Sequence, residues 1–268
     1  MWCQFLWKVA RCEELRILTG LFDKTSHMTK KYTIERIEFP VIGITHSCFK
    51  EKFGIPRQSG LVPEAQARID IVEPYNNPAA FDGLEMSSHI WLQFVFHQSL
   101  KHEWRPKVRP PRLGGNKSLG VFATRSPVRP ANLGMSVVRL ERISFERGVQ
   151  LFVSGADLLD ATPIIDIKPY VPYADSVIEA TNTLADRAPA LLKVVLSTEV
   201  NSAIQSQPSP EALKALIEQV LQQDPRPQYQ KTDSERCYGM RLLEFNLRWR
   251  YHPSAAGDEI EVLSLERQ

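Results

Sequence analysis

The central part of the chain alternates apolar and polar residues in the manner of β-strands. Residues 67–71 have this period of two, which is typical of a strand buried on one face. A nearly continuous apolar run over residues 89–97 favours a strand buried on both faces. Two more strands are predicted over 135–145 and 149–153, with a short hairpin connection at 146–148. Many short strands separated by Gly and Pro turns indicate a β-barrel or a sandwich.

The pattern changes after about residue 175. Ser209-Pro210-Glu211 has the order of an N-cap, a first-turn proline and an early acid, and the apolar residues that follow recur at helical spacing until Pro225. Two strands are then expected, one over 243–250 and one around Ile260 and Val262. Leu263 breaks the alternation of the second strand, so this strand is predicted to be short or bulged. The C-terminal part therefore has the pattern of a small α+β unit.

The segment 104–136 is the most basic stretch of the chain. It holds seven Lys or Arg residues and no acidic residue, interleaved with five prolines and four glycines. This density of Pro and Gly excludes a helix, and only GVFATRS (120–126) has the pattern of a short strand. Cations held on stiff loops bind anions well. The segment is therefore predicted to be an anion receptor.

Charge is distributed unevenly along the 268 residues. Residues 101–147 contain eleven Lys or Arg and three Glu, a net charge of +8, and because the whole chain carries +2 the remainder carries −6. Such an asymmetry indicates a nucleic-acid or phosphate partner. A solvated basic face would have the same composition, so charge alone leaves both interpretations open.

Cysteine spacing and hydropathy exclude several classes of protein. The four cysteines lie far apart and form no CxxC pair, so neither a zinc site nor a disulfide framework is expected, and a cytoplasmic location fits best. No apolar run approaches the ~18 residues of a membrane span. The first 27 residues lack the long apolar stretch of a signal peptide. We interpret residues 1–30 as an N-terminal extension.

Three loops carry polar residues that suit ligand binding. The glycine-rich stretch at 114–120 is neither a dinucleotide-binding nor a P-loop motif, and a tight turn would explain it equally well. His97-Gln98 and His102 lack the spacing of a metal site, which favours a capped strand end or a hydrogen bond to a ligand. The turn at 56–61 offers a cation and exposed backbone amides, although ordinary loops do so too.

A fourth grouping, at 154–170, collects three acids, a lysine and a tyrosine. Asp157 and Asp160 come early in it, and Asp166, Lys168 and Tyr170 come late. Carboxylates in such a set can hold ribose hydroxyls or accept a proton. They can equally cap turns and form surface ion pairs, so these alternatives remain open from the residues alone.

Together, these segments resemble the TsaA-like family of tRNA adenine-N6 methyltransferases, also called tRNA-methyltransferase O. The resemblance covers residues 35–175 and continues more weakly into 224–229 and 245–249. Its motifs stand in one order along the chain: Ile42-Gly43 with Ser47, KEKFGIPRQSGL (50–61), SHIWLQFVFHQ (88–98), WRPKVRPPRLGGN (104–116), GVFATRSPVRP (120–130), GMS (134–136), ADLLDATP (156–163) and DIKPY (166–170).

The resemblance implies both a fold and an activity. The fold is mainly β, with a β-barrel S-adenosylmethionine-binding domain at 31–175, unlike the usual Rossmann-type methyltransferases, and a small α+β domain at 176–268. The implied activity is methyl transfer to N6 of threonylcarbamoyladenosine at position 37 of tRNA, carried out by a homodimer. No metal is expected.

The resemblance also implies site residues. Cofactor contacts carry over onto Ser59, Gly60, Leu61, His97, Gln98, Arg125, Met135, Gly155, Ala156, Asp157 and Leu158. Within this set, Arg125 suits the cofactor's carboxylate and Asp157 suits its ribose hydroxyls. Candidates to accept the proton of the target nitrogen are Asp160, Asp166 and Tyr170. Cations expected to contact tRNA phosphates are Arg105, Lys107, Arg109 and Arg112.

The chain departs from the family pattern at two places. Ser47-Cys48 stands where the family has Ser-Pro, and Arg129-Pro-Ala-Asn-Leu-Gly134 stands where the family has RPNPIG. The second departure affects the loop before Met135. An alternative function is therefore a tRNA-binding β-domain without catalytic activity. A hydrolase built on residues 160–170 would lack a nucleophile–base pair.

Overall fold

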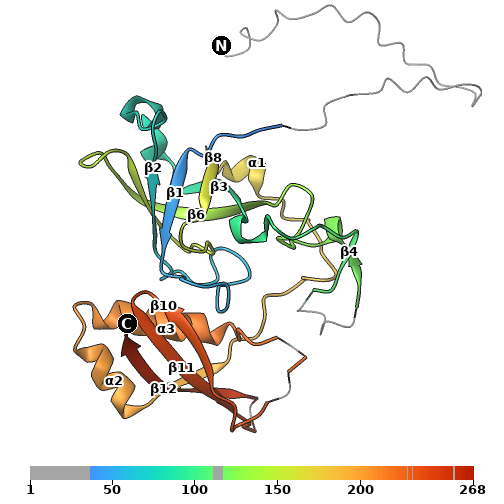
Figure 1. Cartoon of the computed structure of the whole chain (residues 1–268), viewed down its shortest axis with the longest axis vertical. Helices are drawn as coiled ribbons and strands as arrows, with labels where there is room; N and C mark the ends of the chain where they lie inside the picture. The colour runs from blue at the N-terminus through green and yellow to red at the C-terminus, as the bar shows by residue number, and fades with distance from the viewer. Residues whose placement is uncertain (1–36, 111–116, 228, 231, 256) are drawn as a thin grey trace, which may run out of the picture. The chain divides into compact units, whose positions relative to one another are not determined.

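The strands of the central region close into a barrel in the computed structural model, which describes residues 37–110, 117–227, 229–230, 232–255 and 257–268. The residues Phe39–Gln268 form one compact unit. The order of strands around the barrel is β1-β2-β7-β6-β3-β8, and all neighbours are antiparallel. Figure 1 labels β1, β2, β3, β6 and β8 of this barrel. The barrel strands are β1 (Gly43–Ser47), β2 (Ala67–Ile71), β3 (His89–Val95), β6 (Leu133–Ser144), β7 (Gln150–Ser154) and β8 (Pro163–Pro169).

The barrel core comes from every second residue of each strand. Ile90, Leu92 and Phe94 of β3 point inward and are buried, and they pack with apolar residues of the other strands. Trp91 and Gln93 face outward and are half-buried. The prediction that this strand is buried on both faces is therefore wrong for its outer face, whereas the prediction of a mainly β, barrel-forming domain is confirmed.

Short 3-10 helices and one small ladder connect the barrel strands. The helices are η1 (Pro78–Phe81), η2 (Leu84–Met86), η3 (His97–Ser99) and η5 (Val121–Ala123), and the ladder pairs β4 (Lys107–Val108) with β5 (Leu119–Gly120). The strand predicted over 120–126 is wrong beyond Gly120. The chain turns there into η5, because the N–H of Thr124 donates to the carbonyl of Val121 at 3.1 Å instead of to a neighbouring strand.

The C-terminal region is a four-stranded sheet with helices on it. The sheet order is β10-β11-β12-β9, and β9 runs parallel to β12. Its elements are β9 (Lys193–Leu196), β10 (Tyr238–Leu242), β11 (Phe245–His252), β12 (Glu259–Arg267), α2 (Thr198–Gln205) and α3 (Pro210–Gln222), and a short helix α1 (Pro172–Asp175) follows the barrel. The predicted small α+β region is confirmed.

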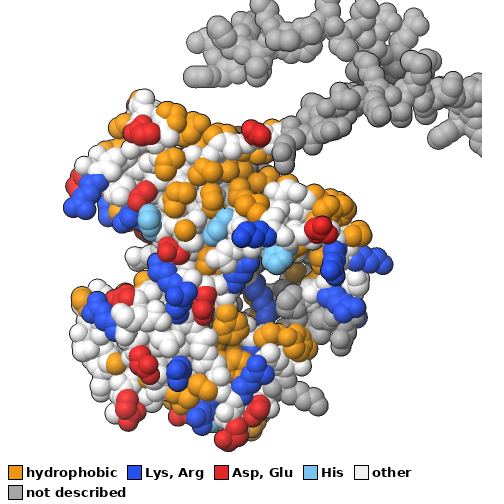
Figure 2. Space-filling model, in the orientation of Figure 1, with side chains coloured by type: hydrophobic (Ala, Val, Ile, Leu, Met, Phe, Trp, Pro, Cys, Tyr) orange, Lys and Arg blue, Asp and Glu red, His pale blue; other side chains and the backbone are white. Residues whose placement is uncertain are grey.

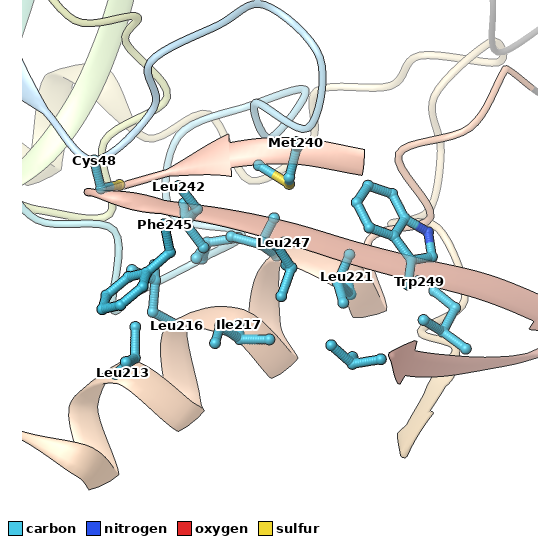
Figure 3. Packing of buried hydrophobic residues seen from close by; sticks show 14 of the residues in the cluster. Cys48, Leu213, Leu216, Ile217, Leu221, Met240, Leu242, Phe245, Leu247 and Trp249 are labelled. Atoms are coloured by element: carbon cyan, nitrogen blue, oxygen red, sulfur yellow. The ribbon is translucent and has the colours of Figure 1, made fainter. Parts of the chain in front are cut away.

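The predicted C-terminal helix forms as α3, with Ser209 at the N-cap position. The helix ends at Gln222, and Asp224 then takes a positive φ of 48° immediately before Pro225. Leu213, Leu216 and Ile217 of α3 point at the sheet, where they meet apolar side chains of β10 and β11 (Figure 3).

Candidate cofactor and RNA site

Two segments predicted to bind the cofactor lie side by side at one end of the barrel. The N–H of Gly60 donates to the carbonyl of Gly155 at 2.8 Å, and Gly155 and Ala156 donate in turn to the loop that contains Gly60, at Pro63 and Ala65. Gly60 and Gly155 have positive φ angles of 77° and 71°. A side chain on Gly155 would put its Cβ in a tight contact, 3.3 Å from the Cα of Gly60, and the positive φ would strain it, so both features favour glycine.

Asp157 follows this glycine contact and is the best-defined polar group of the site. The hydroxyl of Ser136, on β6, donates to its Oδ1 at 2.6 Å. Burial raises the pKa of Asp157, against lowering effects from Ser136, the Arg125 charge and a hydrogen bond from the Ser59 backbone. The carboxyl group is therefore positioned by β6 and by both glycine-containing segments.

Arg125 faces the same region from the loop after η5. Its guanidinium donates to the side-chain carbonyl of Gln58, and its positive charge acts on Asp157. Arg125 is exposed, so it is accessible to a ligand. The site thus presents a guanidinium at its surface and a carboxylate deeper in the barrel end.

His97 and Gln98 lie in η3, which contacts the loop between β1 and β2 through Lys52. The Lys52 ammonium donates to the carbonyl of Gln98 at 3.1 Å. Burial, together with the Lys52 charge, lowers the pKa of His97, so its imidazole is neutral near pH 7. Lys52 and Gly60 belong to the same loop, so this loop contacts both η3 and Gly155.

Met135 is the predicted cofactor residue that the structure sets apart. It lies opposite Gln93 in the β3–β6 ladder and is 58% exposed. Its side chain leaves the outer face of β6, whereas the next residue, Ser136, points inward to Asp157. The Met135 side chain therefore leaves β6 on the face opposite to that from which Ser136 reaches Asp157.

The donor set fits S-adenosylmethionine in its chemistry. The cofactor has ribose hydroxyls, which suit the Asp157 carboxylate, and a carboxylate, which suits Arg125. A Cβ on Gly60 would meet no other atom within 4 Å, so the backbone there is open to a ligand. The neutral imidazole of His97 adds a group that can donate or accept.

The three candidate proton acceptors have separate partners. Asp160 accepts from the Ser47 N–H at 2.8 Å and pairs with Lys50 at 3.0 Å. Asp166 accepts from the Ile167 N–H and pairs with Lys168 at 2.5 Å. Tyr170 follows β8, with its ring 6.1 Å from that of Trp91. At ~3.3 Å per residue, Asp166 and Tyr170 are about 13 Å apart along the chain.

A groove of about 740 Å³ lies elsewhere on the barrel. Its walls include Tyr75, Phe81 and Leu84, and Asp166 reaches it from β8. None of the predicted cofactor residues lines this groove. The predicted cofactor residues and this groove are therefore in different places.

The predicted tRNA contacts lie on and beside β4. Arg105, Lys107 and Arg109 are exposed, and Lys and Arg side chains gather around β4 at the right of Figure 2. Arg112 lies outside the described residues, as do the glycine-rich positions 114–116 and the predicted extension at 1–30. Within the described ranges, no three His, Cys, Asp or Glu side chains are grouped as a metal site requires. No helix there combines the length and apolarity of a membrane span.

The two departures from the family pattern have clear structural settings. Cys48 is buried, which raises the pKa of its thiol to about 12. Asn132 has a positive φ of 47°, and its side-chain amide donates to the carbonyl of Pro127 at 2.8 Å. Asn tolerates this backbone conformation better than most residues. The Asn132 side chain thus bridges the loop before Met135, one position after the asparagine of the family motif RPNPIG.

Three residues that the sequence did not predict as site residues contact predicted ones. They are Gln58, Lys52 and Ser136, which contact Arg125, Gln98 and Asp157. Gln58 stands within PRQSG and Ser136 within GMS, so both belong to motifs that carry the resemblance. Each of these two residues is next to a predicted cofactor residue, Ser59 or Met135, and this position could have identified them. Lys52 belongs to the same motif as Gln58, eight positions before Gly60, but it does not stand beside a predicted cofactor residue.

Comparisons with known proteins agree over both regions. The tRNA-methyltransferase O N-terminal domain matches residues 44–176, and the TrmO C-terminal domain matches residues 189–268. A tRNA (adenine(37)-N6)-methyltransferase of Escherichia coli (strain K12) is 44% identical over 230 residues, which cover 84% of this chain and 97% of that protein. A Pseudomonas aeruginosa protein named as a candidate S-adenosylmethionine-dependent methyltransferase, RcsF, is 51% identical and covers 78% of this chain and 90% of its own length. The crystal structure of TrmO from Pseudomonas aeruginosa superposes with a TM-score of 0.71 at 41% identity, over 86% of this chain and 98% of that one.

Proposed function

Because the chain belongs to the tRNA-methyltransferase O family, we propose that it methylates N6 of threonylcarbamoyladenosine at position 37 of tRNA. At the level of the family, it is a tRNA (adenine-N6)-methyltransferase of class EC 2.1.1, and its cofactor is S-adenosylmethionine. The observation that carries the proposal is the set of contacts joining Gly60 to Gly155 beside Asp157 and Arg125.

The cofactor supplies an already activated methyl group, so the protein's task is mainly alignment and exclusion of water. We assign the ribose hydroxyls to Asp157 and the cofactor carboxylate to Arg125. The backbone of Ser59–Leu61 and of Gly155–Leu158 would contact the rest of the cofactor. His97, Gln98 and Met135 complete the proposed cofactor-binding set.

The target nitrogen loses a proton during or after methyl transfer. Asp160 is the candidate nearest in sequence to the cofactor segments, two residues after Leu158, but its two oxygens are engaged by Ser47 and Lys50. Asp166 and Tyr170 are farther along β8. We therefore keep all three as candidates and give priority to Asp160, whose Lys50 pair is half-exposed and open to rearrangement.

Mass spectrometry of nucleosides tests the proposed reaction. The purified protein is incubated with S-adenosylmethionine and tRNA that bears threonylcarbamoyladenosine, and the expected product is the same nucleoside heavier by one methyl group. Absence of product with tRNA that binds the protein would favour a tRNA-binding β-domain without catalysis. Calorimetric titration separates the two functions: saturable cofactor binding that Arg125→Ala abolishes would exclude the non-catalytic alternative.

We further propose a homodimer working in the cytoplasm, with Arg105, Lys107, Arg109 and Arg112 as phosphate contacts. The resemblance and the widely spaced cysteines support these assignments. We also propose the division into an extension at 1–30 and domains at 31–175 and 176–268. Two separate family-model matches support a boundary between the barrel and the C-terminal sheet. Light scattering of the purified protein measures its oligomeric state.

A further inference from the structure

Phe122 is an exposed aromatic residue in the most basic part of the chain. Phe122 is 75% exposed, whereas the preceding residue, Val121, is 2% exposed. A single exposed apolar side chain is ordinary on a protein surface, so exposure alone decides nothing. What distinguishes Phe122 is how it is held and what surrounds it.

The backbone that carries Phe122 is tightly fixed. Gly120 pairs with Lys107 in the β4–β5 ladder, and the N–H of Val121 donates to the carbonyl of Pro106 at 3.0 Å. The Thr124 N–H and hydroxyl both donate to the carbonyl of Val121, at 3.1 and 2.9 Å. The ring is therefore presented on a stiff turn, and a ligand that stacks on it orders little additional chain.

A cation lies near this ring, and no acid occurs in segment 104–136. The guanidinium carbon of Arg129 lies 6.0 Å from the ring centroid, and Arg129 is held by its own bond to the carbonyl of Thr124. Arg125, which we assign to the cofactor, is three residues away. An aromatic face among phosphate-binding cations is the combination that binds unpaired nucleotides.

We propose that Phe122 is a base-stacking residue that positions an unpaired tRNA base beside the one being methylated. This inference rests on the proposed function, because Phe122 is near Arg125 in the chain and Arg125 is assigned to the cofactor. Lys107, opposite Gly120 in the ladder, binds the flanking phosphate. Phe122 acts as a positioning residue and takes no part in the chemistry of methyl transfer.

The test compares four variants by tRNA affinity, by KM and kcat, and by cofactor affinity. Phe122→Ala raises the Kd and KM for tRNA by about 5- to 140-fold, the range that loss of one base–aromatic stack gives. Phe122→Trp keeps the affinity, whereas Phe122→Leu, which is apolar but has no ring face, behaves like the alanine variant. Phe145→Ala removes another exposed ring, 49% exposed at the end of β6, and leaves tRNA affinity unchanged.

Two further measurements separate stacking from a structural role. The Kd for S-adenosylmethionine and the melting temperature stay at the wild-type values in Phe122→Ala. The slope of log Kd against log salt concentration also stays unchanged, because Phe122 carries no charge. Full tRNA affinity in Phe122→Ala or Phe122→Leu overturns the proposal. Because binding is measured directly, this outcome is distinct from a failure of the wild-type protein to methylate tRNA.

Discussion

Asp157 combines burial with three partners that favour its charged form. Burial dominates, so its folded-state pKa is raised above the usual 3.8 despite Ser136 and Arg125. If the carboxylate accepts hydrogen bonds from ribose hydroxyls, cofactor affinity must fall as pH falls through the raised pKa. The fall begins at a higher pH than it would for an exposed aspartate.

Asp157→Asn tests this assignment. We expect the Kd for S-adenosylmethionine to rise by about 10- to 100-fold, since hydrogen bonds to a charged group contribute ~1.5–3 kcal/mol. The acid-side loss of affinity should also disappear. Calorimetry over a pH series measures both effects. Asp166→Asn, a matched change on β8 away from the glycine contact, should keep wild-type affinity. A wild-type pH profile in Asp157→Asn would contradict the assignment.

The same residue makes a prediction for stability. Because the folded state holds the Asp157 proton to a higher pH than the unfolded state does, the free energy of unfolding should decrease as pH rises from about 3.8 to the raised pKa. The wild type should show this decrease relative to Asp157→Asn in chemical denaturation, and the difference between the two proteins should be constant above that window.

At the scale of elements, the loop after β1 links the barrel to the C-terminal sheet. Phe49 is fully buried and bridges to Leu159 and Leu242, and Phe53 stacks on Trp249 at 5.9 Å. Figure 3 shows Cys48 of this loop next to Leu242. Because the same loop continues into Ser59–Leu61, the C-terminal region supports one wall of the candidate cofactor site.

Gln223, just after α3, provides the most direct test of that support. Its side-chain amide donates to the carbonyl of Leu61 at 3.1 Å. We expect Gln223→Ala to weaken S-adenosylmethionine binding about 2- to 10-fold, and to lower the free energy of unfolding by no more than ~1.5 kcal/mol, the net contribution of one hydrogen bond. Gln222→Ala, one position earlier on α3, is the control. Equal effects of the two changes would show that α3 does not position the loop.

Element prediction succeeded where burial follows the hydrophobic pattern. Leu263 was predicted to bulge or shorten its strand, and β12 does skip Leu263 in its pairing with β11, yet continues to Arg267. β1 was not predicted from the sequence. The residues that it buries, Gly43, Thr45 and Ser47, are not apolar side chains, so they form no hydrophobic alternation. In α2 only Val200 and Ile204 are buried, too few to define a helical period.

Predicting the site depended on motif order more than on local pattern. The motifs identified Gly60, Gly155 and Asp157 as one set, although Gly60 and Gly155 are 95 positions apart in the sequence. Alternation of apolar and polar residues alone carries no such long-range information. Sequence could not distinguish Met135 from Ser136 by the face of β6 that each occupies. That distinction depends on strand register, which barrel closure determines.

For the whole molecule, the asymmetry of charge predicts how tRNA affinity depends on salt concentration. Residues 101–147 carry +8 and the remainder −6, so we expect the phosphate contacts to be concentrated on one segment. Each phosphate contact releases condensed counterions, so each contributes about 0.7–0.9 to the slope of log affinity against log salt concentration. The number of contacts can therefore be obtained from titrations without a structure of the complex.

Lys107 is the cation of choice for this measurement, because it is exposed and has a defined place on β4. Lys107→Ala should reduce the salt slope by about 0.7–0.9, and Arg105→Ala combined with it should reduce the slope by roughly twice as much if the two bind separate phosphates. Lys214→Ala removes the same charge from α3 and should leave the slope nearly unchanged. Fluorescence anisotropy with labelled tRNA from low to moderate salt measures the three slopes. If Lys214→Ala lowered the slope as much as Lys107→Ala does, the affinity would depend on overall charge, and the β4 region would lose its role as the RNA contact surface.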